Sequence, residues 1–568
     1  IDYRALSLGV ALWVGALTQS WMAPWRTTIA LLVLTLFALS QRKRRLIVLV
    51  AALALGSSVM SLRQQSLQSS AITDYFNQSA QVQLRLTTDP HLTTKRVSGR
   101  NFLPPSYSAL ATLIQFEGVN GSFKLRVPVR VIMSDLSAKS LLPGQRISVS
   151  ARVLESKEPR VAALLIANSK IKVMTQPSRW AASLARIRLG LRSASGGGDG
   201  GSLIPGMVLG DTSLQSQSFI TQMRRVGLSH LTAVSGANFA MVATFLFWLL
   251  QFLIKGLRNR LWVVGIILFL FIFLVRPTPS VLRAAVMSAV VILAKYFGER
   301  SFGIPSLAAA IMFLLLLDPI QSTDPGFALS VLATAGILLL SPVIEEKLSK
   351  KVKTTWIVQS ISIPVSATIF CLPVIALISN QLSLVTVPAN ILVAPVIAPI
   401  TLLGFVAAII APIAPFLSSF LLLIATPLAH WIVIISQSMA NLPAISFNRT
   451  FMFFILFTAI IIGLISERKW VIYLAILFLS IQLMISHFTW PGSGWQIANC
   501  DVGQGDGMVV NLGEGNAIVI DVGPEPEKMD QCLRQLGIKS IPLLILTHFH
   551  SDHIGGLSKV LENRRISQ

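Results

Sequence analysis

The feature that most constrains the fold of this chain is an almost continuous apolar stretch from residue 228 to residue 489. A membrane-spanning helix needs about 20 predominantly apolar residues, and a stretch of this length holds several in succession. Charged residues make up only 12% of the chain, against about 25% in soluble proteins, which excludes a soluble enzyme of ordinary type. We predict a polytopic α-helical membrane protein with spans at 5–24, 27–40, 46–62, 229–254, 260–276, 279–297, 304–318, 325–344, 355–379, 384–410, 416–437, 449–466 and 470–489.

The basic residues between these spans predict the orientation of the chain. Cytoplasmic loops of membrane proteins carry an excess of Lys and Arg. When the spans are followed in order, five basic clusters fall on one side, at 42–45, 255–260, 295–300, 347–353 and 468–469. That side is predicted to be the cytoplasm, which places residues 63–177 and everything after 490 outside.

Residues 63–177 alternate between apolar and polar side chains with period two, which indicates β-strands. In 123–131 the odd positions are apolar, and Lys124, Arg126 and Arg130 occupy three of the four even positions. The segment carries fifteen Lys and Arg against six Asp and Glu. We predict a small antiparallel barrel or sandwich with one basic face. Outside the cell such a face suits lipid headgroups, a surface polymer or DNA, and Lys124, Arg126 and Arg130 are the candidate DNA-binding residues, with an ordinary solvated face as the alternative. Aromatic side chains that could stack on bases, or belong to the core, are Tyr75, Phe76, Phe102, Tyr107, Phe116 and Phe123.

A helix and a linker are predicted between this β-domain and the long apolar region. Trp180, Leu184, Ile187 and Leu191 fall on one helical face, which suits a helix at the membrane interface. The glycine-rich run 193–201 predicts a flexible linker. The predicted domains are N-terminal transmembrane helices at 1–62, the β-domain at 63–177, the helix and linker at 178–227, the main transmembrane domain at 228–489 and a C-terminal domain at 490–568.

The C-terminal segment contains a candidate metal site. Three of the seven histidines of the chain, His548, His550 and His553, lie within six residues together with Asp552. The apolar run 541–547 predicts a strand that ends just before them, and imidazole and carboxylate groups at this spacing are typical ligands of divalent metals. A chance cluster is the alternative. The three scattered cysteines, Cys371, Cys500 and Cys532, predict no disulfide framework.

Polar residues also occur within or beside predicted spans. His230, Ser235 and Asn238 lie at the start of the span at 229–254, and Arg283 lies inside another. Polar groups at membrane depth are costly, and they line water or pack helices together. We predict that these four residues line a channel, with tight packing, or snorkelling of Arg283, as the alternative. Possible partners of Arg283 are Asp211, Asp318 and Asp324, and Pro388, Pro395 and Pro399 are expected to interrupt one span or only to kink it.

Residues 490–568 resemble the metallo-β-lactamase-like fold. The HxHxDH motif at 548–553 is the first metal motif of that family, and 499–506 and 518–523 resemble the strand-turn elements before it. The resemblance implies one metal ion on His548 and His550, a second on Asp552 and His553, either Zn or Mn, and a catalytic role for Asp552. It places the remaining ligands beyond Gln568. Because the chain begins at Ile1 and ends soon after the motif, we expect a fragment with a partial αββα domain, an incomplete metal site and no hydrolase activity of its own.

The membrane region resembles the ComEC family of DNA-internalisation proteins from naturally transformable bacteria. The similar runs are 227–238, 279–285, 318–319, 326–330 and 388–390. The family's layout of N-terminal helices, an external OB-like β-barrel domain, a competence membrane domain and a metallo-β-lactamase-like domain is followed over the whole chain. The resemblance implies a multi-pass protein of the bacterial inner (plasma) membrane, which takes up transforming DNA through a channel and passes one strand into the cytoplasm.

The resemblance further implies that the metal domain of the complete protein is a nuclease that degrades the other strand. Expected partners are single- and double-stranded DNA, membrane lipid, an external DNA receptor and a cytoplasmic helicase-like motor. The chain has no Walker motif, so the energy is expected from another protein or from the proton gradient. Two other functions stay open: a transporter of another anionic or lipid-linked substrate with an attached hydrolase, and a scaffold whose metal site is inactive.

Overall fold

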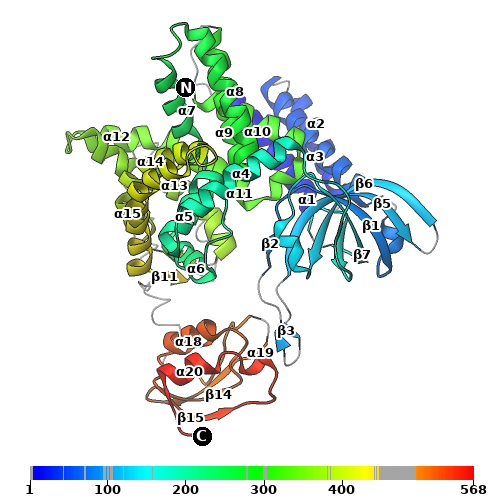
Figure 1. Ribbon diagram of the computed structural model, residues 1–568, viewed down its shortest axis with the longest axis vertical. Helices are drawn as coiled ribbons and strands as arrows, with labels where there is room; N and C mark the ends of the chain where they lie inside the picture. The colour runs from blue at the N-terminus through cyan, green and yellow to red at the C-terminus, as the bar shows by residue number, and fades with distance from the viewer. Residues whose placement is uncertain are drawn as a thin grey trace.

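A helical bundle forms the body of the molecule, with a β-domain and a smaller α/β domain attached to it (Figure 1). The computed structural model describes residues 4–22, 24–41, 44–68, 72–93, 97–98, 101–102, 106–118, 121–156, 158–276, 279–297, 303–379, 381–383, 385–440, 442, 444–446, 494–503 and 505–568. The helices of the bundle that correspond to predicted spans are α1 (Arg4–Trp21), α2 (Pro24–Ser40), α3 (Arg44–Gln68), α7 (Gly236–Leu250), α8 (Leu257–Val275), α9 (Pro279–Tyr296), α10 (Gly303–Leu317), α11 (Pro325–Leu339) with α12 (Ser341–Ser349), α13 (Thr355–Ser379), α14 (Thr386–Ile410) and α15 (Pro415–Met439).

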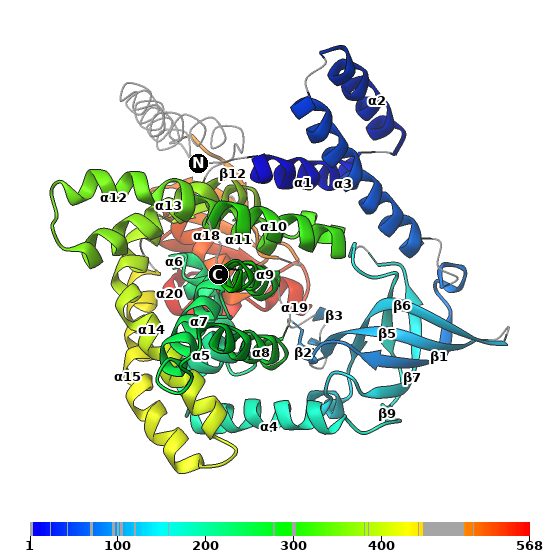
Figure 2. The ribbon, with the colours of Figure 1, turned by 90° about the horizontal axis from the view of Figure 1, so that it is seen from above.

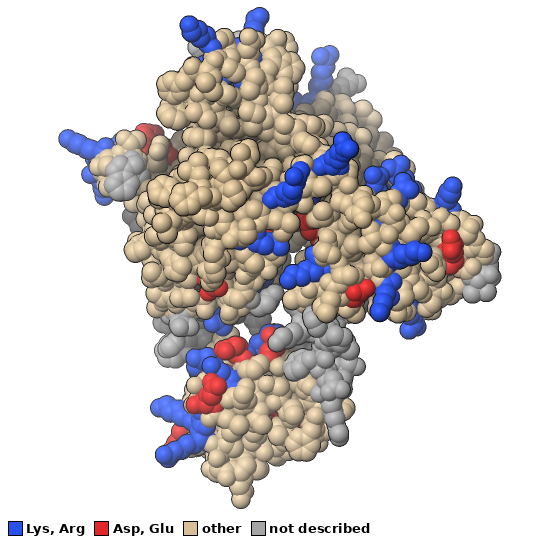
Figure 3. Space-filling view, viewed as in Figure 1, with Lys and Arg blue, Asp and Glu red and all other residues tan. Residues whose placement is uncertain are grey.

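The bundle has the length and surface of a membrane domain. Each of the first eleven predicted spans coincides with a helix, and the spans predicted at 449–466 and 470–489 lie outside the described residues. Six of the described helices are long and apolar enough to cross a membrane, namely α3, α8, α11 with α12, α13, α14 and α15. Ile413 and Phe416 are 85% and 87% exposed, and Figure 3 shows a broad surface of the bundle without charged side chains. The prediction of a polytopic membrane fold is confirmed.

One prediction about the chain within the bundle is wrong, and one of the two alternatives for the proline-rich span is excluded. Residues 193–201 are no flexible linker, because α4 (Arg179–Ala194) is followed almost at once by α5 (Gly198–Leu209), which is buried from Gly200 to its end. The glycines let the backbones approach closely, since a Cβ on Gly201 would lie 2.4 Å from the carbonyl oxygen of Ser195. The proline-rich span is not interrupted either, because α14 continues through Pro395 and Pro399.

The β-domain is a closed barrel of OB-like topology. Its strands are β1 (Ser79–Leu86), β5 (Tyr107–Gly118), β6 (Gly121–Met133), β7 (Arg146–Leu154) and β8 (Ala163–Ala167). They pair in the order β1-β5-β6-β8-β7, and β7 also pairs with β1, which closes the sheet. β6 and β8 are parallel, whereas the other pairs are antiparallel. Apolar residues at alternate positions, such as Val82, Leu84 and Val129, fill the interior, so the predicted OB-like barrel is confirmed over the sandwich.

The barrel is fastened to the bundle by ion pairs. Asp89, which follows β1, accepts two hydrogen bonds from Arg276 between α8 and α9, at 2.9 and 2.8 Å, and Arg188 of α4 lies 3.7 Å from the same carboxylate. Arg160, between β7 and β8, binds Asp324 at the start of α11 at 2.6 Å. Figure 2 shows α4 running between the barrel and α15. These contacts fix the position of the barrel beside the helices.

The C-terminal domain contains a sheet with the strand order β12-β13-β14-β15-β16. The strands are β12 (Ile497–Asn499), β13 (Met508–Gly513), β14 (Asn516–Ile520), β15 (Ser540–Ile545) and β16 (Arg565–Ile566), and the helices are α18 (Pro526–Gln535), α19 (Ser551–Ile554) and α20 (Leu557–Asn563). The last three strands are parallel, with helices in their connections. This agrees with the predicted partial αββα domain. It lies at the opposite end of the bundle from the α7–α8 connection (Figure 1).

Candidate functional site

The predicted metal ligands lie where β15 ends and α19 begins. β15 ends at Ile545, the chain turns through His548 and His550, and α19 brings Asp552 and His553 back toward them. Nitrogen atoms of His548 and His550 and a carboxylate oxygen of Asp552 all lie within 4.8 Å of one another. The His553 ring lies 3.9 Å from the His548 ring, measured between centroids. The structure therefore brings all four predicted side chains to one place.

The donor set fits a divalent cation. Oδ1 of Asp552 is buried and has no hydrogen-bond partner among the described residues, and an unpaired buried carboxylate oxygen is costly unless a cation or a donor faces it. Imidazole nitrogen and carboxylate oxygen are typical ligands of Zn and Mn. His548 is exposed, while His550 and Asp552 are half-buried, so the group is open to solvent on one side.

Asp521 orients one of these histidines and was not predicted. Its Oδ2 lies 2.9 Å from His553 Nδ1, so that His553 Nε2 is left for a ligand, and it also accepts a hydrogen bond from the Thr547 hydroxyl at 2.7 Å. Burial would raise the pKa of Asp521, but the hydrogen bonds from Thr547 and His553 outweigh it and hold this pKa below its ordinary value. Asp521 directly follows β14, the parallel neighbour of β15. The sequence did offer a signal for Asp521, because an aspartate directly follows the apolar run of β14. C-terminal ends of parallel strands lie at the same edge of a sheet, so this side chain could be expected near the histidines that follow β15.

A glycine and a disulfide fix the loop that covers this group. Gly505 has φ +123°, and a Cβ there would lie 1.9 Å from the carbonyl oxygen of Asp552, so only glycine lets the loop approach α19 so closely. At the start of the same loop, Cys500 forms a disulfide with Cys532 of α18. The prediction that the cysteines are unconnected is wrong for this pair, because the chain between these two cysteines, which are 32 positions apart, brings the helix back against the sheet. Cys371 is free and buried.

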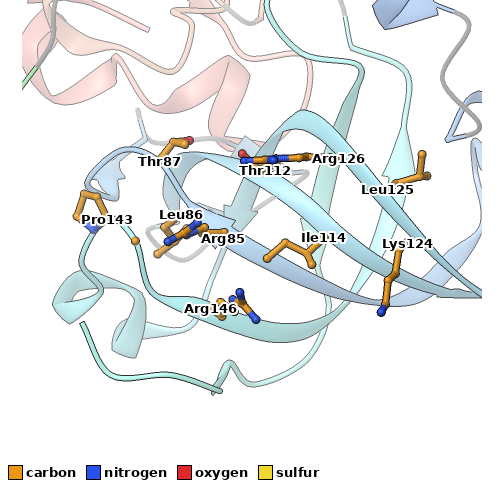
Figure 4. Close-up of a pocket in the computed structure, with 11 residues that line it drawn as sticks. Arg85, Leu86, Thr87, Thr112, Ile114, Lys124, Leu125, Arg126, Pro143 and Arg146 are labelled. Carbon is orange, nitrogen blue, oxygen red and sulfur yellow. The ribbon is translucent and has the colours of Figure 1, made fainter. Parts of the chain in front are cut away.

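A basic groove lies on the outer face of the barrel. It has a volume of about 770 Å³, and four basic side chains from three strands line it: Arg85 of β1, Lys124 and Arg126 of β6, and Arg146 of β7. All four are exposed, and Figure 4 shows Arg85, Arg146 and Lys124 around Ile114. Sequence reasoning missed Arg85 and Arg146, although both occupy polar positions in alternating strands. Part of the groove is formed by strands β5 and β6. OB-like barrels bind polymeric ligands on the face of the corresponding two strands.

The third basic residue predicted on β6 lies outside this groove. Arg130 forms a bidentate ion pair with Glu158 and also donates to the Ser108 hydroxyl at 2.9 Å, so its donors are used within the barrel. Tyr75, Phe116 and Phe123 pack on one another, with centroids 4.8 to 5.2 Å apart, and belong to the core of the barrel. The residues that line the groove include no aromatic side chain. The groove therefore suits phosphate groups better than stacked bases.

The predicted channel residues fall into two groups. The Ser235 hydroxyl accepts the Asn238 N–H at 3.1 Å and donates to the Asn238 side chain at 3.0 Å, which caps α7, and Asn238 donates to the carbonyl oxygen of Met207. These contacts favour a packing role. His230, in the short turn before α7, is exposed to solvent. Arg283 of α9 is 4% exposed.

Comparisons with known proteins agree with these features. Residues 207–492 match the family model described as competence protein, and residues 500–568 match that of the metallo-beta-lactamase superfamily. ComE operon protein 3 of Bacillus subtilis (strain 168) is 25% identical in an alignment over 405 residues, and the match covers 65% of this chain and 50% of that protein. The chain thus spans about half the length of that curated relative. No solved structure matches it significantly.

The family assignment and the fold lead to the same description. The metallo-beta-lactamase superfamily implies binding of a divalent metal, with which the donor set at 548–553 agrees. The apolar helices and the membrane-domain family make this a multi-pass protein of the inner membrane. Because the competence model covers half of the 568 residues, the chain belongs to the competence protein family and carries a metallo-beta-lactamase domain at its C-terminal end.

Proposed function

We propose that this chain forms the channel part of an inner-membrane machine for the uptake of transforming DNA. Duplex DNA is captured outside, and one strand passes through the helical bundle into the cytoplasm. The observation that carries the proposal is the basic groove of Arg85, Lys124, Arg126 and Arg146 on a barrel fastened to a competence membrane domain. Such a groove neutralises several phosphates at once, and its affinity depends steeply on salt.

In this proposal the C-terminal domain of the complete protein hydrolyses the strand that is not imported. His548 and His550 would hold one divalent ion and Asp552 and His553 a second, either Zn or Mn. Bound ions of this kind polarise a phosphoryl oxygen and lower the pKa of water. The protein's own contribution is orientation: Asp521 fixes the His553 ring, and Asp552 carries a buried carboxylate oxygen that has no hydrogen-bond partner among the described residues.

The machine needs partners on both sides of the membrane. An external DNA receptor and a cytoplasmic helicase-like motor are proposed from the family resemblance. The sequence contains no Walker motif, so the motor is proposed to be a separate protein. In this proposal, membrane lipid covers the broad surface of the bundle that lacks charged side chains (Figure 3). The external position of the barrel and of the C-terminal domain is part of the proposal, supported by the basic connections at the opposite end.

The test is internalisation of labelled duplex DNA by competent cells. Deletion of the gene should leave DNA bound at the cell surface and abolish label that becomes nuclease-resistant, and the wild-type gene should restore it. The double variant Lys124→Gln, Arg126→Gln should lower capture as well as uptake. Undiminished internalisation after deletion would refute the DNA channel. A simultaneous loss of small-anion uptake would then favour the alternative transporter.

A further inference from the structure

Arg283 of α9 is a buried guanidinium without a counter-charge. Its Nε and Nη1 atoms are buried and have no hydrogen-bond partner among the described residues. Two of the three acids expected to pair with it bind other arginines, since Asp211 binds Arg192 and Asp324 binds Arg160. A charge in this position costs several kcal/mol unless an anion or water compensates it, at roughly the level found for intramembrane arginines. The group therefore requires a partner that the described residues do not supply.

The guanidinium faces the first turn of α7. A Cβ on Gly236, the first residue of α7, would lie 3.0 Å from Nη2 of Arg283. The side chain of Ser235 caps the N–H of Asn238, whereas helix geometry leaves the N–H groups of Gly236 and Ala237 without intrahelical acceptors. Helix N-termini carry partial positive charge and bind anions. Two independent sources of positive potential thus converge on one point.

This point lies within the bundle, and an exposed histidine precedes it in the chain. α7 has 15 residues, fewer than the roughly 20 that a full span requires. Its C-terminal end leads into the α7–α8 connection at one end of the bundle (Figure 1), so its N-terminus lies within the bundle. His230, six residues before α7 begins, is exposed to solvent. Broken or shortened helices whose N-termini point at a cavity are a common way for membrane transporters to bind anionic groups.

We propose that Arg283 and the N-terminal turn of α7 form a site for one phosphodiester monoanion of the translocated DNA strand. The inference rests on the proposed function and specifies where within the bundle the strand is held. The Arg283 guanidinium binds the two unesterified oxygens, and the N–H groups of Gly236 and Ala237 donate to the same group. A site with one full positive charge suits transit, because passage requires binding strong enough to admit the strand and weak enough to release it.

The first test measures binding by the full chain in nanodiscs of zwitterionic lipid. Arg283→Gln is compared with wild type and with Arg179→Gln, which removes the same charge from an exposed position of α4. A labelled short single-stranded oligonucleotide is titrated at several salt concentrations. Arg283→Gln should reduce the slope of log affinity against log salt by about 0.7, the value for one phosphate contact of a single strand. Arg179→Gln should leave the slope unchanged, and Arg283→Lys should restore most of it.

The second test separates possible sources of the phosphodiester. An oligonucleotide with an uncharged methylphosphonate backbone should bind wild type and Arg283→Gln equally. Wild type could instead melt at a higher temperature than Arg283→Gln only when anionic phospholipid is added, while both proteins bind DNA equally. In that case the ligand is a lipid headgroup, and the assignment to DNA is overturned. Equal slopes for wild type and Arg283→Gln overturn it too. A melting temperature that falls in Arg283→Met would identify a structural arginine, since removal of an unpaired buried charge should leave it unchanged or raise it.

The third test is made in cells, and it distinguishes this inference from the proposed function. Arg283→Gln should leave surface capture of DNA intact and lower internalisation at least about tenfold, as expected for loss of a charged hydrogen bond. If wild type internalises DNA and Arg283→Gln does so equally well, the anion site is refuted while the channel stands. If wild type does not internalise DNA, the proposed function itself has failed.

Discussion

At the scale of single residues, the arginines of β6 show that partners decide what a basic side chain does. Lys124, Arg126 and Arg130 share one strand face, yet the first two are exposed in the groove and the third is bound by Glu158. Glu158 belongs to the connection between β7 and β8, far from β6 in the sequence. A charged side chain that is already paired offers little to a passing phosphate.

The groove residues should therefore respond differently from Arg130 to the same substitution. Lys124→Gln with Arg126→Gln should weaken duplex binding and reduce the salt slope by nearly 2, since each contact with B-DNA contributes about 0.9. Arg130→Gln should leave binding unchanged and lower the free energy of unfolding by about 1 kcal/mol, because the pair with Glu158 is half-exposed. Fluorescence anisotropy and thermal melting measure the two effects, and equal losses of binding would contradict the distinction.

Asp552 should control metal affinity. Replacement by Asn removes the charge of a carboxylate that has an oxygen within 4.8 Å of ligand nitrogens of His548 and His550, and we expect metal affinity to fall by at least about tenfold. Glu562→Gln on α20 removes the same charge outside the ligand group and serves as the control. Metal content after dialysis against Zn or Mn, followed by competition with a chelator, measures the change. Retention of metal by Asp552→Asn would exclude this residue as a ligand.

The candidate sites were predictable to the extent that they are local in sequence. His548, His550, Asp552 and His553 lie within one loop, so their spacing alone identified the group. Asp521, which orients His553, comes from the neighbouring strand. Arg85 and Arg146 reach the groove from β1 and β7, and no local pattern reveals that these two strands pair with each other.

At the scale of elements, burial overrides the preferences that composition suggests. The glycines of α5 are typical of a linker, yet the helix is enclosed by α14 and α15. Glycine is unfavourable in an isolated helix, but here it permits contacts that a side chain would block. A pattern of residues along one segment cannot tell these cases apart, because the deciding contacts come from distant parts of the chain.

Gly206 gives a direct test of this explanation. A Cβ there would lie 2.5 Å from the carbonyl oxygen of Thr232, so Gly206→Ala should destabilise the protein by about 1–3 kcal/mol, as overpacking does. Helix propensity alone predicts the opposite sign, a gain of about 0.5–1 kcal/mol. Gly197→Ala, where a Cβ has open space, is the control. Thermal melting in detergent decides between the two signs.

The disulfide between Cys500, just after β12, and Cys532 of α18 should stabilise the C-terminal domain. It closes a segment of 32 residues, and the loss of such a link costs about 2–4 kcal/mol. Cys532→Ser should lower the melting temperature, and a reducing agent should do the same to wild type while leaving Cys532→Ser unchanged. Cys371→Ser tests a cysteine that forms no disulfide. Insensitivity of the wild-type protein to reduction would exclude a stabilising link.

At the scale of the whole molecule, Asp89 joins the barrel to the bundle. Arg276, which it binds, has φ +80°, a left-handed conformation that a side chain other than glycine rarely adopts. The contact with Asp89 holds this backbone in place between α8 and α9. Because Arg188 lies beside the same carboxylate, one acid compensates two arginines at the junction.

Asp89→Asn should loosen the barrel without unfolding it. Arg276 and Arg188 would repel each other once the carboxylate is gone, and we expect a loss of about 1–3 kcal/mol, as for other broken charged hydrogen bonds. Faster proteolysis and hydrogen exchange in the α8–α9 connection measure the release. Asp74→Asn, an exposed acid on the same domain, should change neither. Unchanged exchange in Asp89→Asn would show that other contacts hold the barrel.

The architecture as a whole followed from the sequence more readily than these junctions. Hydrophobic runs identify spans because the bilayer imposes a length on each helix, and alternating strands identify the barrel because one face is buried. Ion pairs such as Arg160 with Asp324 join residues that are 164 positions apart. Neither an apolar run nor an alternating pattern in the sequence can therefore predict them. The domain limits at 62, 177, 227 and 489 stay predictions.

The unpaired Arg283 has a consequence for how such genes change over time. A buried charge without a partner is retained only while selection maintains the function that uses it. Replacement by an apolar residue would remove the free-energy cost of burying that charge. In lineages that stop importing DNA but still express the gene, this position should drift to Met, Leu or Gln early, before paired arginines such as Arg192 and Arg160. The residue would then serve as a record of lost transformation.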